Sequence, residues 1–175
     1  MRNRIFLKLL AAFVLVIAAA TVTFDFSVHH AWKDSLLQQI ELNLRQKTQM
    51  FVNHVNSVGA LSSLDQKQAG TEQLARLQRI VVEDGRAAGA RATIIDSQGK
   101  VWADSEADPA SMENHAQRTE FVAALKGDVG TDTRRSRTVG VSFLYVAAPV
   151  TGGAVRLAYP LSDVEAALTR RDGHC

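Results

Sequence analysis

The stretch RATIIDSQGKVWAD, from Arg91 to Asp104, decides the fold class. Two strand-like runs, Ala92 to Asp96 and Lys100 to Asp104, flank the tripeptide Ser97-Gln98-Gly99. A glycine at the end of a short loop between such runs is typical of a β-hairpin. The sequence therefore predicts strand, tight turn, strand.

The remaining strands are expected further along the chain. A short helix, Thr119 to Lys126, places Phe121, Val122 and Leu125 on one face and stops at Gly127. The strand candidates after it are Thr131 to Thr138, Val141 to Val150 and Ala154 to Pro160, with turns at Val139-Gly140 and Thr151-Gly152-Gly153. Five antiparallel strands with helices packed on one face predict an α+β domain.

Helical patterns precede the hairpin. One stripe recurs at intervals of three, four and seven residues, as expected of a long helix; it comprises Leu37, Ile40, Leu44, Phe51, Val55 and Val58. Residues 59–70 are rich in breakers and predict a loop. A second helix is expected from Thr71 as its N-cap, with Leu74, Leu77 and Val81 inward, to near Gly85. Leu161 to Leu168 predict a last helix.

The long stripe has two interpretations. It can pack on its own domain, or residues seven apart, Leu37, Leu44, Phe51 and Val58, can form a seam with a second copy. Both can hold along different stretches. Lys47 and His54 occupy the other heptad positions, so the seam is imperfect, and a homodimer through this helix is an expectation.

An apolar segment begins the chain. Leu9 to Phe24 carries no charge, and extension to Ile5 gives about 20 residues interrupted only by Lys8, enough to cross a bilayer. The basic residues Arg2, Arg4 and Lys8 precede it, which keeps the N-terminus in the cytoplasm. We expect residues 5–24 to contact lipid of the inner (cytoplasmic) membrane, with the bulk of the chain extracytoplasmic. The alternative is a signal peptide cleaved after Ala18-Ala19-Ala20, which would release a secreted ligand-binding protein.

Composition excludes several classes of function. Three of the 20 basic side chains precede the apolar segment, leaving 17 against 18 acidic ones, so no nucleic-acid partner is expected. Cys175 is the only cysteine, which rules out an intrachain disulfide and a cysteine metal site. No hydrolase, metalloprotease, nucleotide-binding or dinucleotide-binding motif occurs, so we expect neither an enzyme nor a cofactor or metal.

Several pieces, in order and at compatible spacing, resemble one family. They are TIIDSQGKVWADSEADP (Thr93 to Pro109), MENH (Met112 to His115), Arg118-Thr119-Glu120, the alternating Arg134, Ser136 and Thr138, YVAAP (Tyr145 to Pro149) and VRLAYPL (Val155 to Leu161). These pieces resemble the extracytoplasmic PAS-like, single-Cache sensor domains of histidine kinases similar to the phosphate-regulon sensor PhoR and to WalK. Thr119 departs from that pattern, in which proline is expected after Arg118.

The resemblance implies an input region that transmits a stimulus across the membrane by helix displacement in a two-component system. It also implies a kinase core and a response regulator as downstream partners, so the chain looks truncated. The expected parts are residues 1–24, the cytoplasmic tip and membrane helix; 25–90, two extracytoplasmic helices and their loop; 91–161, the sensor sheet; and 162–175, a helix leading to a missing second span. A chemoreceptor or cyclase input module is the alternative.

Candidate ligand-binding residues lie on and beside the sheet. Arg134, Ser136 and Thr138 share one strand face, where they could bind an anion, with Arg118 joining them. Alternatively, Arg134 or Arg118 pairs with Asp104 or Glu113 to pin the loop.

Two further features, a tyrosine and a carboxylate-rich loop, lie near these residues in the sequence. Tyr145 could offer its hydroxyl to a ligand or fill the core. Asp104, Glu106 and Asp108 alternate as in a calcium loop, but Pro109 and His115 stand where glycine and glutamate are required. The stimulus, a small molecule or a protein, is not named by the sequence.

Overall fold

The computed structural model describes residues 2–59, 70–135, 140–162 and 164. Two compact units are distinguished, Met1–Ile40 and Glu41–Cys175. The first unit is helical and includes Phe6–Phe24, a span of 19 residues with a mean hydropathy of 2.3 and none of its residues buried. By length and composition this segment can cross a membrane, although signal sequences have the same properties.

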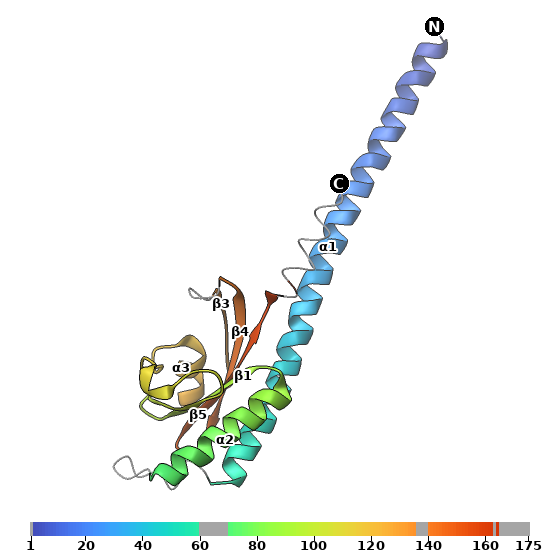
Figure 1. Cartoon of the computed structure of the whole chain (residues 1–175). Helices are drawn as coiled ribbons and strands as arrows, with labels where there is room; N and C mark the ends of the chain where they lie inside the picture. Colours follow the sequence, from blue (N-terminus) through green and yellow to red (C-terminus); the bar gives the residue numbers. More distant parts are fainter. Residues whose placement is uncertain (1, 60–69, 136–139, 163, 165–175) are drawn as a thin grey trace. The chain divides into compact units, whose positions relative to one another are not determined.

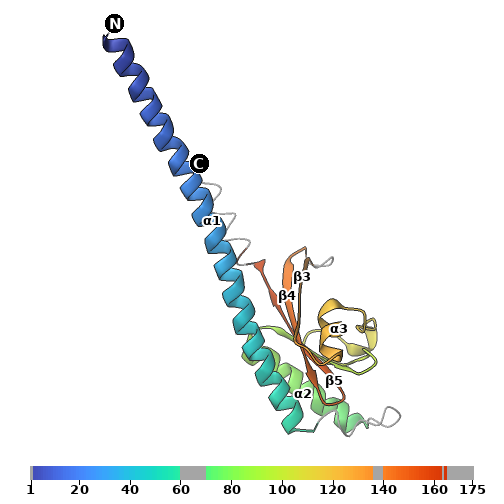
Figure 2. The same cartoon turned by 180° about the vertical axis from the view of Figure 1, so that it is seen from behind.

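The second unit contains the sheet domain, drawn in Figures 1 and 2. Helix α1 (Arg2–Ser57) ends in this unit. The further elements are α2 (Thr71–Ala88), β1 (Arg91–Asp96), β2 (Val101–Asp104), the 3-10 turn η1 (Pro109–Ser111), α3 (Thr119–Leu125), β3 (Gly130–Arg135), β4 (Ser142–Val150) and β5 (Gly153–Pro160). The predicted hairpin is confirmed as β1 and β2.

The five strands form one antiparallel sheet in the order β2-β1-β5-β4-β3. The register places Thr93 of β1 beside Asp104 of β2 on one side and beside Arg156 of β5 on the other. Paired residues project to the same face of an antiparallel sheet. Asp104, Thr93 and Arg156 therefore stand in a row across three strands.

Helices cover both faces of this sheet. Figures 1 and 2 show α3 on the opposite side of the strands from α2 and the end of α1. Side chains that face α1 and α2, among them Ile94, Val146 and Leu157, are fully buried. The expected α+β class is confirmed; the expectation of helices on one face holds for the two long helices, and the short α3 packs on the other.

The apolar stripe of α1 packs on the chain's own domain where it meets the sheet. Leu44 and Phe51 are 2% and 1% exposed, whereas Leu42 and Met50 on the same helix are 59% and 69% exposed. Leu44 and Phe51 therefore pack within their own domain rather than forming a seam with a second copy. Leu37 and Val58, the other two seam residues, are half-buried.

The residues that interrupt the heptad pattern join α1 to α2. Lys47 donates from Nζ to the carbonyl oxygen of Ala88 at 2.9 Å. His54 Nδ1 lies 2.7 Å from Oδ2 of Asp84. Both therefore serve contacts within one chain.

Two boundaries of α2 differ from expectation. Gly70, not Thr71, is the N-cap, and the helix continues past Gly85 to Ala88, where Gly89 adopts φ 62° and caps it. Gly85 faces inward, and a Cβ there would lie 3.0 Å from the Ala90 carbonyl oxygen. The glycine at position 85 thus permits close packing, while Gly89 supplies the left-handed conformation that ends the helix.

Other expected segments lie partly outside the described residues. The strand expected at Thr131 to Thr138 is observed as Gly130–Arg135, and residues 136–139 are not described. Most of the helix expected at Leu161 to Leu168 likewise lies outside the described residues.

Candidate functional site

The face of the sheet under α3 has an apolar half and a charged half. In the apolar half, Phe121 and Ala124 of α3 pack on Ile95, Ala147 and Ala154 of the sheet. This packing fixes the first turn of α3 against the strands. It thereby places Glu120, the residue before Phe121, over the charged half.

Glu120 carries a carboxylate with no exposed side-chain surface. Arg134 donates to it through two parallel hydrogen bonds, Nη1 to Oε2 at 2.8 Å and Nη2 to Oε1 at 2.7 Å. Arg156 adds a third, from Nη1 to Oε1 at 3.1 Å. Such a two-pronged guanidinium–carboxylate pair is among the strongest polar contacts in proteins.

Gly130, the first residue of β3, permits this approach. A Cβ at Gly130 would lie 2.2 Å from the carbonyl oxygen of Glu120 and 2.8 Å from its Cα. Any larger residue would therefore push the first turn of α3 away from the sheet. The glycine brings the Glu120 backbone within reach of the arginines.

A second carboxylate lies across the sheet. Asp104 accepts hydrogen bonds from Arg91 Nε at 2.9 and 3.1 Å and from Thr93 Oγ1 at 2.7 Å. Oδ1 of Asp104 also accepts the backbone N–H groups of Glu106 and Ala107, both at 3.0 Å, which pins the start of the following loop.

Thr93 joins the two halves. Its Oγ1 accepts a hydrogen bond from Arg156 Nη2 at 3.1 Å while donating to Asp104. Arg134 also pairs with Asp132 on its own strand. The result is one connected set of three arginines, three carboxylates and a threonine, which we name the sheet-face cluster: Arg91, Thr93, Asp104, Glu120, Asp132, Arg134 and Arg156.

Aromatic rings hold the two central arginines in place. The guanidinium carbon of Arg134 lies 4.0 Å from the centroid of the Tyr145 ring. The guanidinium carbon of Arg156 lies 5.2 Å from the same ring and 5.0 Å from that of Phe121. Cation–π contacts at these distances stabilise buried guanidinium groups and limit their movement. Tyr145 therefore acts here as a platform for cations.

The charges shift one another's protonation equilibria. Burial alone would raise the pKa of the Glu120 carboxyl, but hydrogen bonds from Arg134 and from its own backbone, with the charges of Arg156 and Arg134, lower it below its ordinary value. Burial lowers the pKa of Arg156, against the pull of Glu120. The cluster thus keeps Glu120 ionised at neutral pH.

Among the described residues, one donor in the cluster has no partner. Arg156 is 4% exposed, and its Nε is buried without a hydrogen-bond acceptor in that part of the chain, although both of its terminal nitrogens are bonded. A buried donor without an acceptor carries a free-energy cost. The guanidinium of Arg156 therefore has capacity for one more oxygen.

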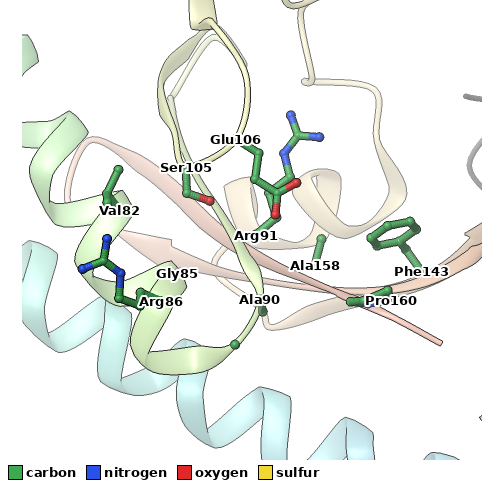
Figure 3. A pocket seen from close by; sticks show the side chains of 11 residues that line it. Val82, Gly85, Arg86, Ala90, Arg91, Ser105, Glu106, Phe143, Ala158 and Pro160 are labelled. Carbon is green, nitrogen blue, oxygen red and sulfur yellow. The ribbon is translucent and has the colours of Figure 1, made fainter. Parts of the chain in front are cut away.

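A pocket of about 550 Å³ adjoins the cluster. Figure 3 shows Val82 and Arg86 of α2 on one side of it and Phe143 and Pro160 on the other, with Glu106 between them. By the strand register, the sheet residues that line it share a face with Arg156; they are Arg91, Phe143, Ala158 and Pro160. Arg91 belongs to both pocket and cluster.

The structure brings together three of the expected site residues. Asp104, Arg134 and Tyr145 meet in the cluster, whereas Ser136 and Thr138 lie outside the described residues. Of the two arginines in the pairing alternative, Arg134 pairs with Glu120 and Asp132 rather than with Asp104 or Glu113.

Arg118 does not join the other arginines. Its Nη2 lies 3.6 Å from Glu113 Oε2, with side chains 41% and 86% exposed. The interpretation of Arg118 as the partner of Glu113 therefore describes the structure.

Several cluster residues were not singled out from the sequence: Arg91, Thr93, Glu120, Asp132 and Arg156. One signal was present, because Arg156 interrupts the apolar strand Val155 to Ala158, and a charge on a strand buried on both faces needs a partner. Nothing comparable marks Glu120. Within the described residues no group of three or more His, Cys, Asp or Glu could hold a metal ion.

Comparisons with known proteins give the fold. No family model and no curated protein matches the chain. The structure is similar to the sensor domain of the Vibrio cholerae histidine kinase DctB (TM-score 0.59, 17% identity), covering 78% of this chain and 56% of that one. It is also similar to the Escherichia coli DcuS sensor domain (TM-score 0.51, 16% identity, 73% of this chain and 96% of that one).

A third similar structure is the sensory domain of the Campylobacter jejuni chemoreceptor Tlp3 with isoleucine bound (TM-score 0.55, 15% identity, 81% of this chain and 63% of that one). The chain thus spans little more than half of the DctB domain. These likenesses, at 15–17% identity, show a shared fold, and they do not single out PhoR or WalK.

Proposed function

We propose that this chain is the extracytoplasmic input region of a two-component sensor histidine kinase, anchored in the inner membrane by residues 5–24. The observation that carries the proposal is a fold shared with the sensor domains of DctB and DcuS, in a chain that also contains an apolar helix, Phe6–Phe24. A kinase core and a response regulator would be its partners in the full-length protein. The fold shared with Tlp3 supports a chemoreceptor input module as the second candidate.

Signalling requires two states of the domain with different affinity for the stimulus. A ligand shifts such an equilibrium only by the difference between its two binding free energies. The pocket beside Arg91 and the sheet-face cluster are where we propose that the stimulus acts. Both touch α2 or the strands that pack on α1, and displacement of these helices would carry the signal.

The anchor and its orientation can be tested with reporter fusions in a bacterial inner membrane. Alkaline phosphatase fused after Cys175 is active only outside the cytoplasm, so we expect activity, and a cytoplasmic fluorescent reporter at the same position should stay dark. The purified product should retain residues 1–24. A mature chain that begins at Thr21 would contradict the anchor and support the secreted alternative.

The input role can be tested by joining the chain to the kinase core of a characterised sensor whose response regulator drives a reporter gene. We expect Arg134→Ala to change reporter output, because it removes both hydrogen bonds to Glu120. Arg135→Ala is the matched control, since Arg135 is exposed and its side chain donates a hydrogen bond to the backbone carbonyl oxygen of Gly140 rather than to a carboxylate. Equal output from both variants, at equal protein levels, would contradict the proposal.

A further inference from the structure

We propose that Glu120 is a built-in ligand: Arg134 and Arg156 form a carboxylate-binding site, and the chain's own Glu120 fills it and keeps it closed to external carboxylates. The inference rests on the proposed function only for its consequence in signalling. The binding site itself follows from the geometry of the cluster.

The arrangement around Glu120 is that of a bound carboxylate. Both oxygens accept hydrogen bonds from Arg134, and one also accepts from Arg156, at 2.7 to 3.1 Å. The rings of Tyr145 and Phe121 flank the two guanidinium groups. Planar forks that converge on one carboxylate are how proteins recognise such groups in ligands.

Glu120 leaves no room for a competitor while it is in place. Its side chain has no exposed surface, and the Gly130 contact holds its backbone against β3. An external carboxylate could enter only if Glu120 withdrew with the first turn of α3. The site has capacity beyond Glu120, however, because Arg156 Nε is buried and no described residue accepts its hydrogen bond.

The charge balance supports an internal occupant over an open site. Asp104 neutralises Arg91, and Asp132 and Glu120 neutralise Arg134 and Arg156. Without Glu120, the partly exposed Arg134 would keep Asp132, but the buried Arg156 would lose the one carboxylate that pairs with it among the described residues. An unpaired buried cation is strongly unfavourable, so the vacated site would bind an anion from solution.

The side chain of glutamate offers a matched probe. Glu120→Ala removes a CH₂–COO⁻ group, which is the size and charge of acetate. We expect acetate to restore the lost contacts in this variant, with acetamide, its neutral counterpart, having no effect. In the wild-type chain Glu120 competes intramolecularly with acetate for the arginines. Acetate should therefore bind wild type on the order of tenfold or more weakly than it binds Glu120→Ala.

The experiment uses the full chain in detergent micelles or nanodiscs, with isothermal titration and thermal unfolding in sodium acetate against sodium chloride at equal ionic strength. Glu120→Ala should bind acetate and unfold at a higher temperature in acetate than in chloride. Glu120→Gln, which keeps the shape but loses the charge, is the second variant should Glu120→Ala fail to fold in chloride. It should bind acetate with an affinity between those of Glu120→Ala and wild type.

Glu113→Ala is the matched control, because it also removes a carboxylate from an arginine, but at an exposed pair. It should respond to acetate no more than wild type does. The inference is overturned if Glu120→Ala and Glu113→Ala respond alike, or if wild type binds acetate as tightly as Glu120→Ala. Acetate binding with a silent signalling reporter would instead contradict the proposed function and leave the built-in ligand standing.

Discussion

At the scale of single residues, the cluster under α3 concentrates charge where a small domain usually places apolar side chains. Glu120 has a fully buried side chain and Arg156 is 4% exposed, so both have lost their hydration. Ion pairs in such surroundings contribute little net stability over apolar substitutes, yet removing one partner is costly. The cluster is therefore better explained by specificity for a carboxylate than by stability.

The Glu120 carboxyl predicts how stability varies with acidity. Its pKa is lower in the folded than in the unfolded chain, so its contribution is complete above the unfolded value of about 4.5 and is lost as the pH falls below it. Glu120→Gln should be less stable at pH 7 and should lose less stability between pH 5 and 3. Urea unfolding at a series of pH values measures this; parallel curves for both proteins would contradict it.

Thr93 tests the connection between the two halves of the cluster. Thr93→Val keeps the shape but removes the oxygen that bonds both Arg156 and Asp104. We expect a loss of about 1–3 kcal/mol in the free energy of unfolding, because two buried charged groups each lose a partner. Thr133→Val, at an exposed position of β3, is the control and should stay within about 0.5 kcal/mol of wild type.

Sequence reasoning located the charged strand faces but not their partners. Arg134 was predicted because alternation on a strand fixes which side chains share a face, and Asp104 because it alternates with Glu106 and Asp108 as in a calcium loop. Glu120 was not predicted as a site residue. The residue that it contacts, Arg134, lies on a different element, a strand that follows a turn in the sequence. Pairing across elements depends on how α3 packs on the sheet, and no local pattern contains that information.

At the scale of elements, the part of α1 from Glu41 onward belongs to the domain core. Phe51 is 1% exposed and Met50, its neighbour, is 69% exposed. Phe51→Ala should lower the free energy of unfolding by about 3–5 kcal/mol through cavity formation. Met50→Ala should cost less than about 0.5 kcal/mol. Chemical denaturation in detergent checks both, and similar losses would mean that α1 is not packed as described.

The elements themselves were largely predictable, because each follows from a local rule. The hairpin, β4 and β5 were found from turn glycines between β-branched and apolar runs. The end of α2 was misjudged because Gly85 and Gly89 look equivalent in sequence. Only packing distinguishes the glycine that lets Ser105 and Ala90 approach from the one that caps the helix.

At the scale of the whole molecule, the α+β fold class followed from the order of the elements. The choice between an intrachain stripe and a dimer seam did not, because apolar heptad residues satisfy both. The structure buries Leu44 and Phe51 within one chain, and Lys47 and His54 bind α2. A second copy would have to use the exposed side of α1.

A homodimer through α1 stays a prediction, and it can be tested by cysteine cross-linking in a Cys175→Ser background. Leu42 and Met50 are exposed and eight residues apart on α1, which corresponds to a rotation of about 80° and a rise of about 12 Å, so neither shares the face of the buried Phe51. Leu42→Cys and Met50→Cys should form disulfide-linked dimers in membranes. Phe51→Cys should not, because that position is buried. Cross-linking at all three positions or at none would contradict a dimer through this surface.

The position of β5 in the sheet constrains when the domain can be completed. β5, at Gly153–Pro160, lies between β1 and β4, so β1 can gain its second neighbour only after some sixty further residues have been made. Until then Ile94 and Ile95 lie on a strand edge whose backbone groups are unpaired. Such an edge can pair with strands of other chains and cause aggregation. A chain exported from its N- to its C-terminus would thus depend on chaperones that bind the unfolded chain until β5 has been exported. The yield of folded protein should fall sharply when β5 is truncated.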